Sequence, residues 1–277
     1  MLKSILALAD GGATTDATLQ TAMRAAERFD AYLDVLHISP GAEPMAVFAT
    51  GEAMPMVGVA EETIRNHIEA RRKNAKSAYD RVVGASRPHV AWREDEGRAV
   101  ELLASAGRLC DLLVISRPGD GSDELFPGCV NTALFETGRA VLVAPPEAMP
   151  TIGTRVAVAW NDSIQASRAV AASLPFLTKA SEVMVFTAGT AARQSAADRL
   201  AHYLGHYGIK CRVDGFDPGS GSGRARGRAV LRRANDMGAD LLVMGAYGQG
   251  RMMQFLGLGG ATAKVITANT MPLLMAH

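Results

Sequence analysis

One stretch of the sequence decides the fold: Leu241-Leu242-Val243-Met244-Gly245-Ala246-Tyr247-Gly248-Gln249-Gly250-Arg251. Its first four residues are all apolar, which is typical of a strand buried on both faces of a parallel sheet. Glycines follow at once, and residues 261–266 then have the pattern of a helix start. A strand, a glycine-rich loop and a helix start together place backbone N–H groups where they can face an anion. The pattern alone fits phosphate binding and an ordinary loop equally well.

The first half of the chain alternates between strand-like and helix-like segments. Apolar runs predict strands at residues 4–9, 32–38, 89–92, 111–116 and 141–144, and helical spacing predicts helices at 14–29, at 61–83 and from 97. Residues 40–60 have no firm periodicity, and we interpret them as a mobile connection rather than a flap over an apolar groove. The alternation predicts an α/β fold with a mainly parallel sheet and helices on both faces.

The second half repeats the first. Residues 227–230 are identical to residues 97–100, and the runs at 156–161, 240–245 and 271–275 match those at 5–10, 111–116 and 140–144. The register between the copies shifts by about the length of residues 40–60, so one insertion accounts for it. A proline-rich linker at 145–150 separates the copies. We therefore predict two tandem domains, residues 1–146 and 151–277, each an open five-stranded sheet.

The composition excludes several classes of function. The chain has 29 basic and 28 acidic residues, and this balance argues against a large nucleic-acid interface. No segment reaches the roughly 18 consecutive apolar residues of a membrane span. The amino terminus lacks a full signal-peptide pattern because Asp10 and glycines interrupt it. The three cysteines have neither disulfide nor zinc-site spacing. We expect a cytoplasmic protein that spans no membrane.

No catalytic set stands out in the sequence. It contains no G-x-S-x-G elbow and no H-E-x-x-H helix, and no Walker A lysine follows the glycines. His202 and His206 have the spacing of two metal ligands on one helix, but no third ligand is evident, so an exposed helix face is the better interpretation. An enzyme with weak ATPase or adenylyl-transfer activity is the least favoured of three hypotheses.

These features together resemble the universal stress protein family, in its tandem two-domain form, over nearly the whole chain. Nucleotide-binding members of that family carry the motif G-x2-G-x9-G-[ST] after the fourth strand. Gly245 and Gly248 fit its first part, but eight residues separate Gly248 from Gly257 and ten separate it from Gly259. Residues 259–262 are similar to the family's helix entry with one residue inserted before it. The resemblance implies an adenine-nucleotide-alpha-hydrolase-like fold.

The first copy departs further from that motif. Ser116 stands where the first glycine would, and Pro127 removes a backbone donor from the loop. Asp10 holds the family's acidic position at the end of the first strand, and Asn161 holds it in the second copy. The resemblance therefore implies that the second copy binds ATP, with Mg²⁺ where the phosphates require it, and that the first copy does not.

The resemblance also gives the expected site and partners. The expected cofactor-binding residues are Asn161, Asp162, Ser163, Thr187, Gly245, Gly248, Gly250, Arg251, Gly259, Gly260, Ala261 and Thr262. Ser163 is also expected to cap the helix that follows it. No residue is assigned a catalytic or metal-binding role. The fifth strands are expected to pair within the chain as a pseudo-dimer, and a homodimer is a further expectation.

Two further hypotheses share this fold. The first is a stress-response protein that an adenine nucleotide regulates by binding to the second copy. The second is a nucleotide-independent interaction protein that acts through an unidentified protein partner, with the altered glycine spacing as its motivation.

Overall fold

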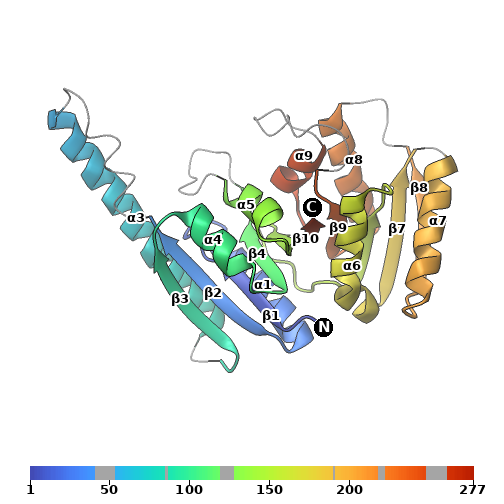
Figure 1. Ribbon diagram of the computed structural model, residues 1–277, viewed down its shortest axis with the longest axis horizontal. Helices are drawn as coiled ribbons and strands as arrows, with labels where there is room; N and C mark the ends of the chain where they lie inside the picture. The colour runs from blue at the N-terminus through green and yellow to red at the C-terminus, as the bar shows by residue number, and fades with distance from the viewer. Residues whose placement is uncertain (41–53, 85–86, 119–127, 190, 218–221, 248–260) are drawn as a thin grey trace.

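The computed structural model describes residues 1–40, 54–84, 87–118, 128–189, 191–217, 222–247 and 261–277 (Figure 1). The elements of the first half are β1 (Ser4–Leu8), α1 (Thr15–Phe29), β2 (Tyr32–Ser39), α3 (Met54–Val83), β3 (Val90–Glu96), α4 (Ala99–Gly107), β4 (Leu112–Ser116), α5 (Cys129–Glu136) and β5 (Ala140–Ala144). Those of the second half are β6 (Arg155–Ala159), α6 (Ile164–Lys179), β7 (Glu182–Ala188), α7 (Ala191–Gly205), β8 (Cys211–Phe216), α8 (Gly223–Asp236), β9 (Leu241–Gly245), α9 (Ala261–Ala268) and β10 (Leu273–Ala276).

The described strands form a ten-stranded sheet with the order β3-β2-β1-β4-β5-β10-β9-β6-β7-β8. Each half contributes five neighbouring strands, and the pairings within each half are parallel. β5 and β10 join the halves as an antiparallel pair, with Leu273 opposite Val143 and Met275 opposite Val141. The predicted α/β architecture is confirmed, and the fifth strands pair inside one chain as expected.

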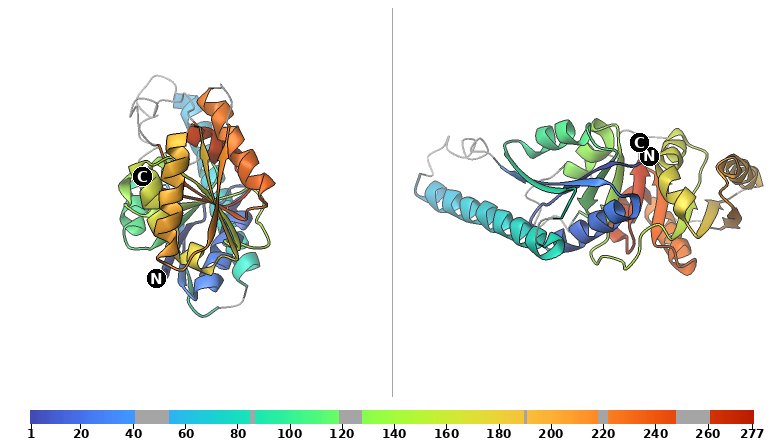
Figure 2. Two further views of the ribbon diagram at one scale, coloured as in Figure 1. Left: turned by 90° about the vertical axis from the view of Figure 1, so that its right-hand side faces the viewer. Right: turned by 90° about the horizontal axis from the view of Figure 1, so that it is seen from below.

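Side chains alternate between the two faces of the sheet and build an apolar core on each face. One core contains residues of α1, α3, α6 and α7, and the other contains residues of α4, α5, α8 and α9. Helices therefore cover both faces, as Figure 2 shows. On β6, Val156 and Val158 belong to the first core and Ala157 to the second. Burial on both faces explains the continuous apolar runs in the sequence.

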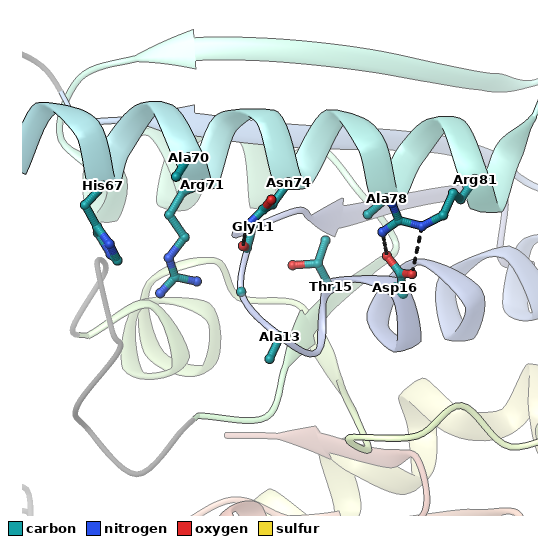
Figure 3. Close-up of a pocket in the computed structure, with 11 residues that line it drawn as sticks. Gly11, Ala13, Thr15, Asp16, His67, Ala70, Arg71, Asn74, Ala78 and Arg81 are labelled. Atoms are coloured by element: carbon teal, nitrogen blue, oxygen red, sulfur yellow. Dashed lines mark hydrogen bonds and ion pairs between the residues drawn. The ribbon is translucent and has the colours of Figure 1, made fainter.

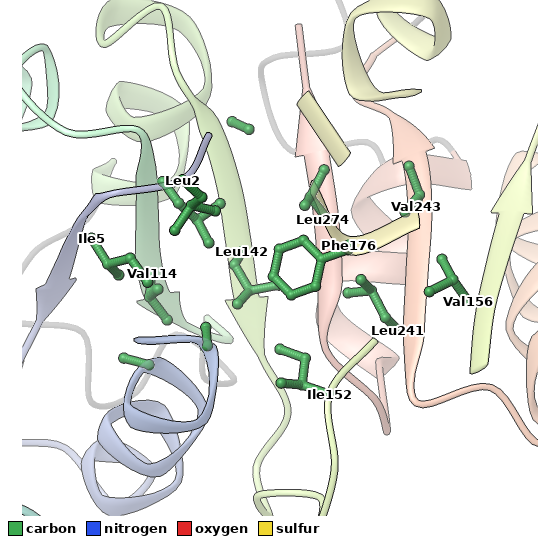
Figure 4. Close-up of a cluster of buried hydrophobic side chains, with 14 of the residues drawn as sticks. Leu2, Ile5, Val114, Leu142, Ile152, Val156, Phe176, Leu241, Val243 and Leu274 are labelled. Carbon is green, nitrogen blue, oxygen red and sulfur yellow. The ribbon is translucent and has the colours of Figure 1, made fainter. Parts of the chain in front are cut away.

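The two halves also pack through helices beside the central strands. Phe176 of α6 is fully buried and meets Phe29 of α1 edge to face, with 4.7 Å between the ring centroids. Figure 4 shows the Phe176 ring among side chains of strands from both halves. Arg28 adds hydrogen bonds of 2.7 Å from Nη2 to the carbonyl oxygens of Gly153 and Lys179. Apolar and polar contacts thus join the halves outside the sheet.

Helix α3 is longer than the sequence predicts. It begins at Met54 rather than at residue 61. Pro55 suits the first turn of a helix, whereas Gly58 weakens the helical pattern. The interpretation of residues 40–60 as a connection is therefore wrong for 54–60, and 41–53 lie outside the described residues.

Strand β3 also extends beyond its predicted end. It continues to Glu96 instead of ending at Trp92, and it forms an edge of the sheet. Acidic side chains are tolerated there because an edge strand leaves them in solvent. Among the helices in the described ranges, none is long and apolar enough to cross a membrane.

Candidate functional site

The second half brings its predicted residues together where the strand order reverses. β6 is the parallel neighbour of both β7 and β9. The chain leaves β6 toward β7 and leaves β9 toward β10, so the carboxyl ends of β6 and β9 form a topological switch point, the usual place for ligands in open α/β sheets. Asn161, Thr187 and Gly245 lie at the carboxyl ends of these three neighbouring strands.

The turn from β6 into α6 is fixed by its own polar side chains. Asn161 Oδ1 accepts hydrogen bonds from Ser163 N at 3.3 Å and from Ser163 Oγ at 2.7 Å. Ser163 Oγ accepts a hydrogen bond from Ala166 N at 3.1 Å, so the predicted helix cap is confirmed. Asp162 has a φ of 60°, and its exposed carboxylate lies 3.6 Å from Arg199 of α7.

Gly245 ends β9 where a side chain has no room. A Cβ atom at Gly245 would lie 2.5 Å from Ala166 N and 2.8 Å from Gln165 C. Both are backbone atoms of the first turn of α6, so they cannot rotate away. The end of β9 therefore lies directly against the amino terminus of α6, where backbone N–H groups carry partial positive charge.

The described ends of the glycine-rich loop meet each other. Tyr247 N donates a hydrogen bond of 3.3 Å to Thr262 Oγ1, so the Thr262 hydroxyl ties α9 to the end of β9. Tyr247 has a φ of 49°, and Ala261 begins α9. The other predicted loop residues lie outside the described residues: Gly248, Gly250, Arg251, Gly259 and Gly260.

Two buried polar atoms at this edge have no hydrogen-bond partner among the described residues. One is Thr187 Oγ1, on a residue only 2% exposed, and the other is Trp160 Nε1. The parallel register of β6 and β7 sets Trp160 beside Thr187 on one face of the sheet. The sequence analysis did not assign Trp160 to the site. The repeat could have indicated Trp160, because this large residue occupies the position of the small Ala9 in the first half.

The equivalent point of the first half is closed by hydrogen bonds. Asp10 Oδ1 accepts from Gly12 N at 3.0 Å and from Thr15 Oγ1 at 2.7 Å. Asp10 Oδ2 accepts from Ser116 Oγ at 2.6 Å, which joins the ends of β1 and β4. His37, at the position of Thr187, is fully buried, and its Nδ1 lies 2.7 Å from the Ala9 carbonyl oxygen.

Tyr247 connects the second-half loop to the first half. Its ring centroid lies 5.5 Å from that of Phe135 of α5, and Phe135 lies 4.4 Å from the ring of His277. Burial raises the pKa of the Tyr247 hydroxyl. A displacement of Tyr247 would therefore change a contact between the halves.

The described residues contain no group of three or more potential metal ligands. His202 lies on α7 and His206 lies in the turn just after its end; both are exposed, with 4.9 Å between ring centroids. The expectation that both lie on one helix is therefore wrong for His206.

Comparison with known proteins agrees with this architecture. The model of the universal stress protein family matches residues 1–134, the copy whose glycine motif departs further from the family. No curated protein sequence matches the chain. A universal stress protein solved in complex with cAMP aligns with 45% of the chain and 96% of its own length at 25% identity, but its TM-score of 0.35 is too low to carry an argument.

Two solved structures cover the whole chain. A universal stress protein from Archaeoglobus fulgidus DSM 4304 aligns with 98% of the chain and 97% of its own length at 16% identity, with a TM-score of 0.64. A protein from Pseudomonas aeruginosa UCBPP-PA14, assigned to the same family, aligns with 99% of the chain and 92% of its own length at 14% identity, with a TM-score of 0.56. These likenesses show the fold of the whole chain. The match over residues 1–134 shows that the first half of the chain belongs to the universal stress protein family, and the second half has the same topology.

Proposed function

We propose that the protein is a stress-response protein that binds ATP or a related adenine nucleotide in its second half as a regulatory ligand. The difference between the two switch points carries the proposal. In the first half, the Ser116 hydroxyl closes that point by its hydrogen bond to Asp10. In the second half, Gly245 stands in the place of Ser116 and brings no side chain to Asn161. The second switch point thus lacks the side-chain bond that closes the first.

The buried polar atoms beside it suit the edge of a purine. A buried polar group without a hydrogen bond costs about 1–3 kcal/mol, so a ligand that pairs with Thr187 Oγ1 or Trp160 Nε1 gains that energy on binding. Asp162 offers carboxylate oxygen atoms for ribose hydroxyls, whereas Asn161 Oδ1 already accepts two hydrogen bonds from Ser163. By the family resemblance, the loop from Gly245 to Thr262 supplies N–H donors for phosphate, and Mg²⁺ accompanies the phosphates.

The contact between Tyr247 and Phe135 supports a regulatory role for the ligand. A nucleotide that displaces Tyr247 changes the packing against α5 in the other half. Neither the motifs of the sequence nor the described residues supply a positioned base or a metal-ligand group for hydrolysis. We therefore assign the nucleotide a conformational role. A protein partner would bind the surface near Tyr247 and α5 that the nucleotide alters.

Calorimetric titration with ATP and Mg²⁺ tests the proposal through two matched variants. Thr187→Val removes a buried hydroxyl that has no partner among the described residues, so the free protein should keep or raise its Tm while the Kd for ATP rises about 2- to 10-fold. Thr21→Val removes an equally buried hydroxyl that donates to the Ala17 carbonyl oxygen at 2.8 Å. It should lower the Tm and leave the Kd unchanged.

The wild-type titration decides between the two leading hypotheses. One ATP bound per chain, weakened by Thr187→Val alone, supports the nucleotide-regulated protein. Absence of heat with ATP in the wild type would refute it and favour the nucleotide-independent interaction protein.

A further inference from the structure

The exposed side of helix α8 carries arginines at a spacing of four residues. Arg224, Arg228 and Arg232 are all exposed, and we call them the arginine stripe. Residues four apart on an α-helix lie on one face, about 6 Å apart along the axis, so the stripe is about 12 Å long. The other side of α8 is buried in the second core through Leu231 and Ala234. Packing therefore holds the helix with the arginine stripe toward solvent.

The arginine stripe has no partner within the part of the chain that the structure describes. None of its three side chains forms a hydrogen bond or an ion pair there. The neighbouring Arg233 does form one, with the carboxylate of Asp214 on β8. Asp236 is the carboxylate of α8 itself, and it makes no ion pair with Arg232, which lies one turn before it. The stripe thus leaves three positive charges without a counter-charge on one helix face.

Other exposed arginines of the chain show the usual arrangement. Arg81 Nη2 of α3 lies 2.7 Å from Asp16 Oδ1 of α1, as the dashed lines of Figure 3 show. Arg87 Nη1 lies 2.7 Å from Glu27 Oε1. On a helix, like charges four residues apart repel each other and lower its stability. The arginine stripe contains neighbours of this kind and no carboxylate that offsets them, so folding alone does not explain it.

The surroundings of the stripe favour carboxylates of a protein over nucleic acid or lipid. Proteins bind single-stranded nucleic acid with aromatic side chains on which the bases stack, but α8 exposes no large hydrophobic side chain. The exposed Tyr203 belongs to α7, which covers the opposite face of the sheet (Figure 2). A helix on a membrane inserts its apolar side, whereas that side of α8 is buried in the core. A guanidinium fork matches the two oxygens of a carboxylate.

We propose that the arginine stripe is a docking surface for an acidic segment of another protein. A helical segment with a carboxylate at every fourth position presents these groups at the same spacing of about 6 Å, so each arginine meets one carboxylate. Each exposed pair contributes little by itself, so the complex is weak and sensitive to salt. The surface includes neither Tyr247 nor α5, and the docking requires no bound nucleotide.

Fluorescence anisotropy of a labelled peptide tests this surface on the full chain without nucleotide. The probe is an alanine-based peptide with glutamate at every fourth position, and the control peptide has glutamine at those positions. We expect saturable binding of the glutamate peptide at low ionic strength, its loss at high salt, and no binding of the glutamine peptide. Arg228→Gln, in the middle of the stripe, should weaken binding about 2- to 5-fold, as expected for one exposed ion pair. Replacing all three arginines by glutamine should abolish saturation.

Arg226→Gln is the matched control. Arg226 is exposed on the same helix, but residues two apart on a helix do not share a face, so this variant should leave the Kd unchanged. Arg228→Gln should keep or raise the Tm because it removes repulsion between like charges, and a lower Tm would contradict the unpaired state of Arg228.

Two results would overturn the proposal directly. The first is a glutamate peptide that does not bind the wild type, and the second is equal weakening by Arg226→Gln and Arg228→Gln. Tighter binding of polyuridylate RNA or of phosphatidylserine vesicles than of the glutamate peptide would also overturn it, since the partner would then be a nucleic acid or a membrane.

Discussion

Replacing Gly245 by serine gives the second half the residue that Ser116 provides in the first. The new Cβ atom would lie 2.5 Å from Ala166 N, about 1 Å inside ordinary contact, and the obstacle is backbone. Overpacking of this kind costs about 1–3 kcal/mol. Displacing Ala166 also breaks its bond to Ser163 Oγ, and loss of such a cap costs about 1 kcal/mol. Each kcal/mol lowers the Tm of a chain of this size by about 2–4 °C, so we expect a fall of about 5–10 °C.

Thermal unfolding followed by circular dichroism measures this effect, and Gly205→Ser is the matched control. Gly205 ends α7, and a Cβ atom there would meet nothing within 4 Å. The control should therefore stay within about 2 °C of the wild type. Equal Tm values for the two variants would refute the close packing of β9 against α6. In calorimetric titrations of the same samples with ATP, Gly245→Ser should show no heat of binding, and the Gly205→Ser control should retain it.

Three further outcomes follow from the described contacts. Asp240 accepts hydrogen bonds from Thr151 Oγ1 and from the N–H groups of Thr154 and Arg155. Asp240→Ala should therefore lower the free energy of unfolding, measured in urea, by about 3 kcal/mol, whereas Asp236→Ala at an exposed position should change it little. Burial raises the pKa of Asp111, but hydrogen bonds from the N–H groups of Lys3 and Ser4 lower this pKa by more, so the net pKa is lowered. The difference in the free energy of unfolding between the wild type and Asp111→Asn should therefore be full at pH 7 and vanish as the pH falls below about 4. Burial raises the pKa of Cys110 to about 11, so mass spectrometry after thiol labelling at pH 8 should find Cys211 modified well before Cys110, and equal rates would contradict the burial of Cys110.

The strands were predictable because matching apolar runs occur in both halves of the sequence. A run such as Leu241 to Met244 is buried on both faces, so its continuous apolar character survives in the sequence, and the matching run in the first half confirms it. The start of α3 was missed because Gly58 interrupts the helical pattern, although the helix begins at Met54. The end of β3 was missed because the strand lies at an exposed edge and ends in acidic residues, which lack the apolar pattern by which strands are predicted.

The candidate sites were predictable only as far as local patterns reach. The repeat pointed to Gly245 and to the turn after β6, since both belong to a short motif. It gave no indication that Arg71 is buried against Gly11 and Gly12, because these glycines precede it by many residues and a charged helix position normally faces solvent. The bond between Ser116 and Asp10 was equally hidden, because it joins two strands that become neighbours only in the folded sheet.

The two copies have diverged at pairs of positions rather than at single ones. In the first half, small Ala9 lies beside His37, whose ring fills the space and bonds to the Ala9 carbonyl oxygen. In the second half, the large side chain is Trp160, which packs against the first core, and the small one is Thr187. Ser116 with Asp10 and Gly245 with Asn161 form a second such exchange. The first exchange moves the larger ring from one strand to the other. The second removes the bond that closes the switch point in the first half, and the proposed nucleotide site in the second half depends on the absence of that bond.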